Sequence, residues 1–421
     1  MRNSKPIEIM SPVGSYETLM AAIQGGASSV YFGVGHLNMR SKSTYNFSIY
    51  DLNNIVNICN ENNVKSYLTV NIVIYDSEIT EMQILIRSAK QAGVTAIIAS
   101  DMAVLEYGKK IGIEIHASTQ LNISNFEAVK FYARYCDVII LARELTIEQI
   151  TLICKQIDKE NICAPSGNKV RIEVFVHGAL CMSISGKCYL SLHQNNNSAN
   201  RGRCLQNCRH SYTVTDKESG YQLDIENDYI MSPKDLCTIH ILDKILDAGV
   251  TVLKIEGRAR SPEYVKIVTG CYHQAVEAWK TNNFNNENIE LWLNKLKTVY
   301  NRGFWEGYYL GAKLGEWTKN YGSSATKQKI YIGKVTNFFK NISVAEILIE
   351  TGEMEVNDNI LIIGPSSGVV EHKVNEIRLN DKSTTNIVQK GSVCSIVTNC
   401  LVRRNDKVYK WINKNNVNQP A

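Results

Sequence analysis

The sequence lacks any long apolar segment. No run of apolar residues approaches the roughly 20 residues that a helix needs to cross a bilayer. The N-terminal stretch from Met1 to Ile7 also lacks the apolar core of a signal peptide. We therefore expect a cytoplasmic protein that does not enter a membrane, in a compartment where stable disulfides are rare.

Several catalytic motifs are missing as well. The chain has no H-E-x-x-H metalloprotease motif, no P-loop and no dinucleotide-binding glycine motif after a first strand. Its net charge is only +5 and its isoelectric point about 8.4. Dedicated nucleic-acid-binding domains often have an isoelectric point above about 9, so the charge of this chain permits binding to a nucleic acid without requiring it.

Cysteine, in contrast, is abundant and unevenly placed. Five of the twelve cysteines fall within one stretch, with the spacing C-x6-C-x15-C-x3-C and a fifth cysteine after 28 intervening residues. Thiolates gathered in this way suit an iron–sulfur cluster or a zinc site. Zinc sites pair close ligands, and the irregular wide spacing here favours a [4Fe–4S] cluster, although zinc or no metal remain open. The five are Cys181, Cys188, Cys204, Cys208 and Cys237.

Short apolar strands alternate with helical stretches over the first 260 residues or so. Eight such units are the number in a (β/α)8 barrel, which we predict; a doubly wound open sheet is the alternative. The expected strands are Ile7–Met10, Ser29–Phe32, Lys65–Val70, Ala96–Ser100, Glu114–Ala117, Val138–Ala142, Ile172–Val176 and Val252–Glu256.

The pattern predicts two domains. Residues 1–325 form the TIM-like barrel, interrupted after the seventh strand by a cysteine-rich insertion at about 178–240. Residues 326–412 read as strands and turns only, which predicts a small C-terminal β-barrel domain. We expect the polar tail 413–421 to be disordered.

Polar residues follow the predicted barrel strands at their carboxyl ends, where such barrels hold their active sites. Any one of them could instead cap the next helix. Arginine in this ring suits the two-pronged binding of carboxylate or phosphate. The ring includes Asn71, Gln120, Arg143, Glu144, His177, Glu256 and Arg258.

The run Glu173-x-Phe175-x-x-Gly178-Ala-Leu-Cys181, followed by Gly186-x-Cys188 and Ser191, resembles the collagenase-like peptidase family thirty-two, whose catalytic type is unassigned. The resemblance extends over most of the chain. Its further landmarks are Ser11-Pro-x-Gly14, His116-Ala-Ser118-Thr-Gln120, Ala142-Arg-Glu144, Lys234-Asp-Leu-Cys237 and Lys254-Ile-Glu-Gly257-Arg258.

The resemblance implies an activity other than the one in the family's name. The better understood members are oxygen-independent hydroxylases with a [4Fe–4S] cluster on four cysteines, and the hydroxyl that they add is linked to prephenate. They act on quinone precursors, on ribosomal RNA or on the wobble uridine of tRNA. This chain is most similar to the tRNA type, so we expect it to form 5-hydroxyuridine in tRNA.

The cluster ligands follow from the same resemblance, and the other site residues from the polar ring at the strand ends and the arginines of the insertion. The resemblance implies cluster ligands at Cys181, Cys188, Cys204 and Cys237, with Cys208 as the alternative. The co-substrate carboxylates would bind Arg143 and Arg258, and substrate would also meet Asn71 and Gln120. Proton handling or base orientation would fall to Glu144, His177 and Glu256, and RNA phosphate to Arg201, Arg203 and Arg209.

Three other functions remain open at this stage. A peptidase would cleave gelatin or peptides without a cluster. A hydroxylase could act on ribosomal RNA instead of tRNA. A non-enzymatic RNA-binding protein with a structural metal would bind tRNA and leave its nucleosides unchanged.

Overall fold

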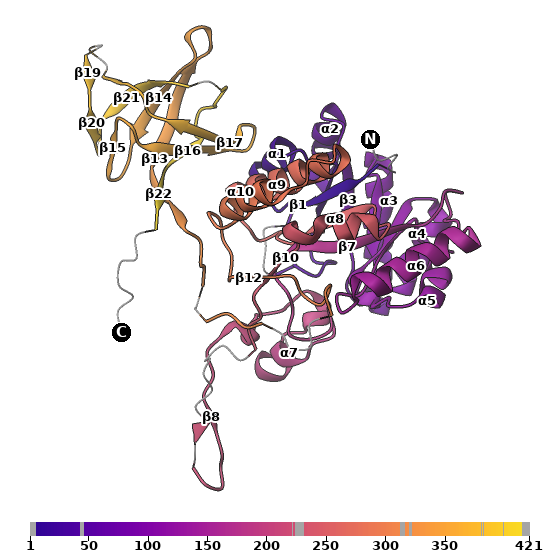
Figure 1. Ribbon diagram of the computed structural model, residues 1–421. Coiled ribbons are helices and arrows are strands. Elements are labelled where there is room, and N and C mark those ends of the chain that lie inside the picture. Colours follow the sequence, from indigo (N-terminus) through magenta and orange to yellow (C-terminus); the bar gives the residue numbers. More distant parts are fainter. Residues whose placement is uncertain are drawn as a thin grey trace.

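The computed structural model describes residues 6–42, 46–220, 222–223, 231–311, 316–319, 322–379, 381, 383–398 and 400–414 (Figure 1). Its N-terminal part is a barrel of eight parallel strands, closed where β11 pairs with both β1 and β7. This closure confirms the (β/α)8 barrel and excludes the open sheet. The strands are β1 (Glu8–Pro12), β2 (Ser29–Phe32), β3 (Lys65–Val70), β4 (Ala96–Ala99), β5 (Glu114–Ala117), β6 (Val138–Ile140), β7 (Arg171–Gly178) and β11 (Val252–Ile255).

Amphipathic helices cover the barrel from outside. α3, for example, buries Met82, Leu85, Ile86 and Ala89 and stops at Gly93, whose φ of 84° favours glycine. None of the described helices has the length and apolarity to cross a membrane. The helices of the barrel are α1 (Tyr16–Gln24), α2 (Leu52–Glu61), α3 (Ile79–Ala92), α4 (Met102–Ile111), α5 (Phe126–Tyr132), α6 (Ile147–Glu160), α8 (Leu242–Asp247), α9 (Pro262–Lys280) and the following α10 (Asn286–Leu296).

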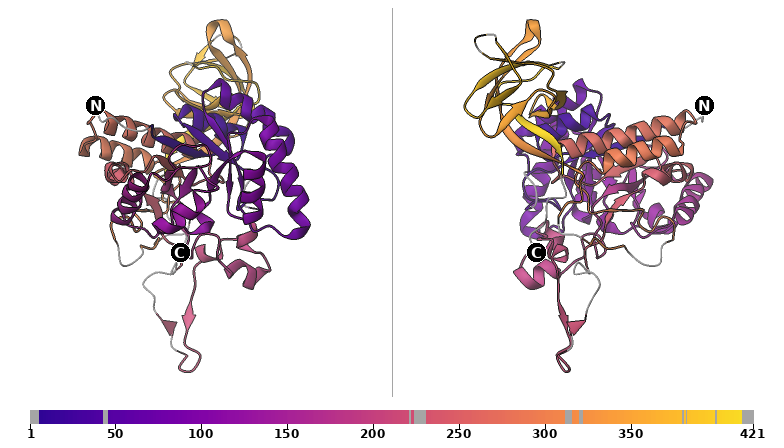
Figure 2. Two further views of the ribbon diagram at one scale, coloured as in Figure 1. Left: turned by 90° about the vertical axis from the view of Figure 1, so that its right-hand side faces the viewer. Right: turned by 60° about the vertical axis from the view of Figure 1, so that its left-hand side comes forward.

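The predicted cysteine-rich insertion lies between β7 and β11. It contains α7 (Leu190–Asn195) and the hairpin β8–β9 (Val214–Thr215 and Gln222–Leu223), which projects from the barrel in every view (Figures 1 and 2). It ends in β10 (Asp235–Cys237), which pairs antiparallel with β7, and β12 (Phe304–Trp305) then pairs with β10. The sheet therefore extends beyond the barrel by two strands that the sequence did not predict.

The C-terminal part is an antiparallel β domain with its own apolar core. It packs on α1 and α9: the side-chain amide of Gln24 donates to the carbonyl of Ser367 (2.8 Å), and Lys329 pairs with Glu263 (2.8 Å). Its strands are β13 (Lys327–Phe339), β14 (Val344–Ile349), β15 (Glu353–Glu355), β16 (Asn359–Gly364), β17 (Gly368–Lys373), β18 (Ile377–Leu379), β19 (Thr384–Thr385), β20 (Ile387–Gln389), β21 (Val393–Val397) and β22 (Lys407–Asn413).

The predicted disordered tail begins inside β22, since this strand runs to Asn413 and pairs there with Lys327. Residues 415–421, the remainder of that prediction, lie outside the described residues.

Candidate active site at the carboxyl end of the barrel

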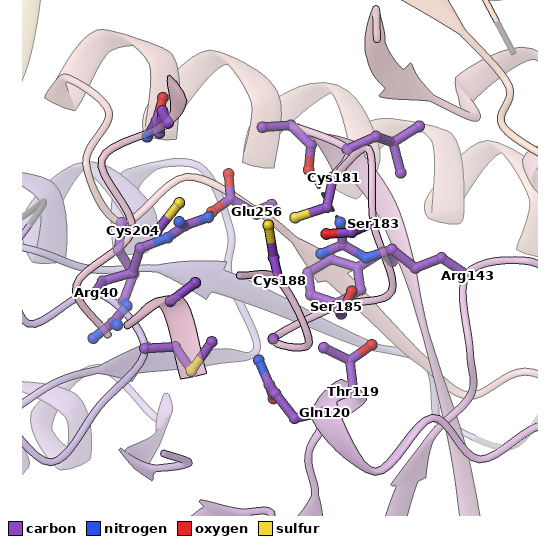
Figure 3. A pocket seen from close by; sticks show the side chains of 18 of the residues that line it. Arg40, Thr119, Gln120, Arg143, Cys181, Ser183, Ser185, Cys188, Cys204 and Glu256 are labelled. Atoms are coloured by element: carbon purple, nitrogen blue, oxygen red, sulfur yellow. Dashed lines mark hydrogen bonds and ion pairs between the residues drawn. The ribbon is translucent and has the colours of Figure 1, made fainter. Parts of the chain in front are cut away.

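A cavity of about 380 Å³ opens at the carboxyl end of the barrel (Figure 3). Barrel strands supply Tyr31, Thr69, Phe175 and Lys254 to its wall. The loops that follow the strands and the cysteine-rich insertion supply most of the other lining residues. Active sites of this fold lie at this end of the barrel, because the loops that follow the parallel strands meet there.

Four thiols line this cavity: those of Cys181, Cys188, Cys204 and Cys208. Burial raises the pKa of the Cys208 thiol, Arg209 opposes that effect, and the other three thiols raise it further. The Cys208 thiol is therefore close enough to the other three thiols to interact with them electrostatically. All twelve cysteines lie in the described part of the chain, and each is a free thiol.

Two contacts hold the thiol-bearing loops together. The guanidinium of Arg209 donates to the carbonyl of Leu180, which joins the segment of Cys208 to that of Cys181. The same guanidinium donates to the Pro233 carbonyl (2.8 Å) at the far end of the insertion. Arg209 thus lines the cavity, and its hydrogen bonds connect segments of the insertion.

Cys237 is not part of this group. It lies opposite His177 in the β10–β7 ladder and is 1% exposed. Burial raises the pKa of its thiol to about 12, and its neighbours there are Tyr272 and the backbone of Ile239. The structure therefore brings together Cys208 and the other three thiols, and leaves Cys237 behind the cavity wall.

The cavity is strongly cationic. Among its described residues seven cations face one carboxylate, that of Glu256. Such an excess of guanidinium groups favours a ligand with more than one negative charge. The seven are Arg40, Arg143, Arg209, Lys254, Arg258, Arg260 and Arg302.

Glu256 is held as a carboxylate. It accepts a 2.6 Å hydrogen bond from Nη2 of Arg40, a residue in the loop after β2. Burial alone would raise the pKa of Glu256, but Arg40, Arg260 and Arg143 outweigh burial and lower it to about 2. Glu256 is therefore a hydrogen-bond acceptor near neutral pH and a poor proton donor.

Arg258 is built into the floor of the cavity. It donates to the Asn38 side chain (2.8 Å) and to the Thr69 hydroxyl (3.3 Å), and burial lowers its pKa to about 10. Gly33 makes room for it, because a Cβ at that position would collide with the guanidinium. Arg143 lies with its guanidinium carbon 3.9 Å from the ring centre of Phe175 and donates to the carbonyl of Ala179 (3.2 Å).

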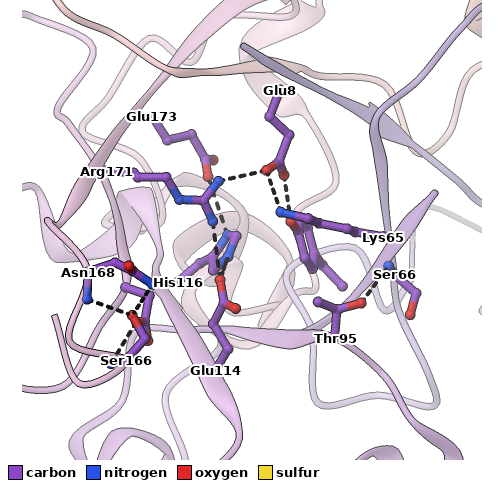
Figure 4. A network of polar contacts seen from close by, with 12 residues as sticks. Glu8, Lys65, Ser66, Thr95, Glu114, His116, Ser166, Asn168, Arg171 and Glu173 are labelled. Atoms are coloured by element: carbon purple, nitrogen blue, oxygen red, sulfur yellow. Dashed lines mark hydrogen bonds and ion pairs between the residues drawn. The ribbon is translucent and has the colours of Figure 1, made fainter. Parts of the chain in front are cut away.

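A charged network fills the barrel beneath the cavity (Figure 4). The first residues of β1, β3, β5 and β7 form one layer at the amino end of the barrel. They are Glu8, Lys65, Glu114 and Arg171, in that order. Arg171 bridges Glu8 (2.8 Å) and Glu114 (3.2 Å), and Lys65 pairs with Glu8 (3.3 Å). These pairs close the end of the barrel opposite the cavity.

A second charged layer connects this network to the cavity. Lys254, which lines the cavity, pairs with the buried Glu173 (2.8 Å). Glu173 lies 3.7 Å from His116, which contacts Glu114 (3.2 Å) in the first layer. Burial lowers the pKa of His116, but the two carboxylates outweigh it and raise the pKa overall. Lys254 is thereby anchored from below.

Other predicted site residues divide into two groups. Asn71 and Gln120 line the cavity. Glu144 is exposed and not among the lining residues. His177 is 1% exposed behind the wall, between Tyr272 and Phe304, and burial lowers its pKa to about 3.

The two remaining arginines also lie away from the cavity wall. Arg201 pairs with Glu78 and stacks 3.9 Å over the ring of Tyr75, so its charge is already used within the protein. Arg203 is exposed on the insertion.

The sequence reasoning missed Arg40, Lys254, Arg260 and Arg302. Lys254 carried a signal, since a lysine within the apolar strand Val-Leu-Lys-Ile must find a buried partner. Arg260 follows the Glu-Gly-Arg landmark by two residues and stacks 3.6 Å over Tyr300. Arg40 carried no signal, because its partner lies 216 residues away in the sequence.

Comparison with known proteins places this site in a family. A collagenase of Porphyromonas gingivalis is 56% identical over 409 residues, which are 97% of this chain and 99% of that protein. The tRNA hydroxylation protein P1 of Bacillus subtilis is 29% identical over 382 residues, 89% of this chain and 87% of that protein. A 23S rRNA 5-hydroxycytidine synthase of Escherichia coli is 37% identical over 280 residues, 66% of this chain and 40% of that protein. The family model of peptidase family U32 matches residues 14–319, and the chain therefore belongs to peptidase family U32.

Proposed function

We propose that this chain hydroxylates carbon 5 of the wobble uridine in tRNA, with prephenate as co-substrate and a [4Fe–4S] cluster. The observation that supports this proposal is the meeting of four thiols and seven cations around one cavity. We assign the cluster to Cys181, Cys188, Cys204 and Cys208. Cys208 replaces Cys237 in this set, because Cys237 lies behind the cavity wall.

The donor set fits such a cluster chemically. Four free cysteine thiols are the ligands that [4Fe–4S] clusters require. Among the described residues, no three His, Cys, Asp or Glu side chains lie close enough together to hold a metal ion. The segment of Cys181 and Cys188 and the segment of Cys204 and Cys208 would therefore move closer together around a cluster. When bound, the cluster would supply electron transfer beside the substrate.

The surrounding side chains suit a small dianion. Prephenate carries two carboxylates, and Arg143 and Arg258 face the cavity from the sixth and eighth strand ends. Glu256 stays ionised and fixes Arg40, so it orients cations and does not supply a proton. Lys254, anchored by Glu173, adds a cation that can hold an anion or a developing negative charge.

Proteolysis is the second candidate, and a specific observation favours it. The chain is 56% identical to a protein named collagenase and 29% identical to a tRNA hydroxylation protein. Sequence identity therefore supports a peptidase more strongly than a hydroxylase. The cavity gives this candidate little chemistry. Its described lining residues include cysteines and serines but no histidine that could activate them.

Nucleoside mass spectrometry separates the two. A strain that lacks the gene should lose 5-hydroxyuridine from its tRNA, and the wild-type gene should restore it, whereas Cys188→Ser should not. Cys400→Ser, an exposed cysteine far along the chain in the β domain, is the matched control and should restore it fully. Unchanged 5-hydroxyuridine in the deletion strain, together with gelatin cleavage by the purified protein, would establish the peptidase instead.

A further inference from the structure

A small cluster of amides on the cavity wall has a fixed orientation. The backbone N–H of Met39 donates to the side-chain oxygen of Asn71 (3.2 Å), so the Asn71 amino group must point the other way. That amino group donates to the hydroxyl of Ser118 (3.1 Å) and to the side-chain oxygen of Gln120 (3.4 Å). Ser118 also donates to this Gln120 oxygen.

These contacts determine what Gln120 offers to the cavity. Its oxygen accepts from two donors, whereas its amino group makes no hydrogen bond to any described residue. Gln120 lines the cavity, and Figure 3 shows its amide nitrogen directed into it. Gln120 therefore presents two N–H donors to the cavity and no acceptor of its own. Rotating the amide would lose the bond from the Asn71 amino group, because one amino group cannot accept a hydrogen bond from another.

The amide is also tied to the loop that carries the thiols. Gly186, between Cys181 and Cys188, packs directly on Gln120. A Cβ at Gly186, where φ is 76°, would come within 2.5 Å of the Gln120 Cγ. This close approach holds the donor beside the segment of Cys188.

We propose that the Gln120 amino group reads the carbonyl O4 of a uracil base and thereby selects uridine against cytidine. This inference rests on the proposed function. Uracil presents an acceptor at position 4, and cytosine presents an amino donor there. The Gln120 amino group would bond the first and would oppose an N–H to an N–H with the second, so cytidine would leave both groups unpaired.

The same contact would position the reacting atom. Carbon 5 is bonded to carbon 4 in a pyrimidine, so holding O4 at Gln120 places carbon 5 next to the anchored amide. Because Gly186 packs on that amide, carbon 5 would then lie close to the loop of Cys188. Asn71 and Ser118 act as positioning residues, since they hold the amide and do not themselves face the base with a free donor.

The test uses the anaerobically purified holoenzyme and two anticodon stem-loops that differ only in uridine or cytidine at the wobble position. Affinity is measured by fluorescence anisotropy, and hydroxylation of each RNA by mass spectrometry. Gln120→Met should weaken binding of the uridine RNA by about tenfold, the loss of roughly one such hydrogen bond. Gln120→Glu keeps one oxygen for Ser118 and Asn71 and turns the other, an acceptor, to the cavity. It should shift the preference toward cytidine by about tenfold or more.

Controls keep the outcomes separate. Gln91→Met changes an exposed glutamine in the last turn of α3 and should match the wild type. The iron content should be equal in all variants. Unchanged uridine-to-cytidine ratios in both Gln120 variants, with an active wild type, overturn the inference alone. A raised requirement for prephenate at an unchanged base ratio also overturns it, because the amide would then hold a carboxylate. A wild type that hydroxylates neither RNA overturns the proposed function as well.

Discussion

The ion pair between Arg40 and Glu256 gives the sharpest energetic prediction. Both side chains are largely buried, with exposures of 27% and 12%, and their atoms lie 2.6 Å apart. Arg40→Met removes the guanidinium that bonds to Glu256 and leaves this carboxylate with its longer-range interactions with Arg260, Arg143 and Arg258. A buried carboxylate that loses its hydrogen-bonded partner destabilises the folded state more than the loss of the pair as a whole.

The magnitude follows from the pKa of Glu256. The pKa lies at about 2 against an ordinary 4.5. A shift of one unit corresponds to about 1.4 kcal/mol, so the folded protein favours the carboxylate by about 3 kcal/mol. Arg40 is the strongest of the groups that lower this pKa. We expect Arg40→Met to lower the free energy of unfolding by about 2 kcal/mol at pH 7. Arg40→Met combined with Glu256→Gln should recover about half of that loss.

A double-mutant cycle measured by urea denaturation at pH 7 is the assay. Single variants, the double variant and wild type give the coupling energy, for which we expect about 1–2 kcal/mol. The contribution of Glu256 is present above its ordinary pKa and is lost as the pH falls toward 2. The coupling should therefore fade in acid. If the changes in unfolding free energy of the two single variants simply add at pH 7, so that the coupling energy is near zero, the ion pair between Arg40 and Glu256 does not stabilise the fold as predicted.

Three further predictions concern the ligands, the barrel floor and the cation grip. Cys208→Ser should lose the iron of the anaerobically purified protein and Cys237→Ser should retain it; the opposite pattern would reinstate Cys237 as a ligand. The pKa of Glu8 is about 2 in the folded protein, against an ordinary 4.5, because His116, Arg171 and Lys65 outweigh the effect of burial. The ionised Glu8 therefore stabilises the fold fully above about pH 4.5, and this stabilisation is lost as the pH falls toward 2. Glu8→Gln should lower the melting temperature at pH 7 and flatten its decline in acid, and parallel melting curves would contradict this. Arg258→Lys should lower hydroxylation about tenfold with iron unchanged, since an ammonium cannot hold Asn38, Thr69 and a carboxylate together.

Local patterns predicted the barrel well, because each strand is a short apolar run bounded by polar residues and glycine. β2, β3 and β5 begin and end at the predicted residues. The predictions failed to include β10, since an added strand that pairs with β7 depends on the path of a long insertion. That pairing buries Cys237, which the family resemblance had placed among the cluster ligands.

The arginines of the cavity were also only partly predictable from local sequence patterns. Arg143 and Arg258 could be predicted because they follow barrel strands, and both line the cavity. Arg40 could not, because it lies in an irregular loop and meets Glu256 only through the closed barrel. Arg201 was expected to bind RNA phosphate and instead pairs with Glu78, a partner that no sequence pattern indicated.

The most direct test of the account is a reconstituted reaction without dioxygen. Anaerobically purified protein is mixed with tRNA from the deletion strain and prephenate, and the tRNA is digested and analysed by mass spectrometry. We expect protein with about four iron per chain and 5-hydroxyuridine that forms only when prephenate is present. Iron-free protein that forms no 5-hydroxyuridine and cleaves gelatin would contradict it.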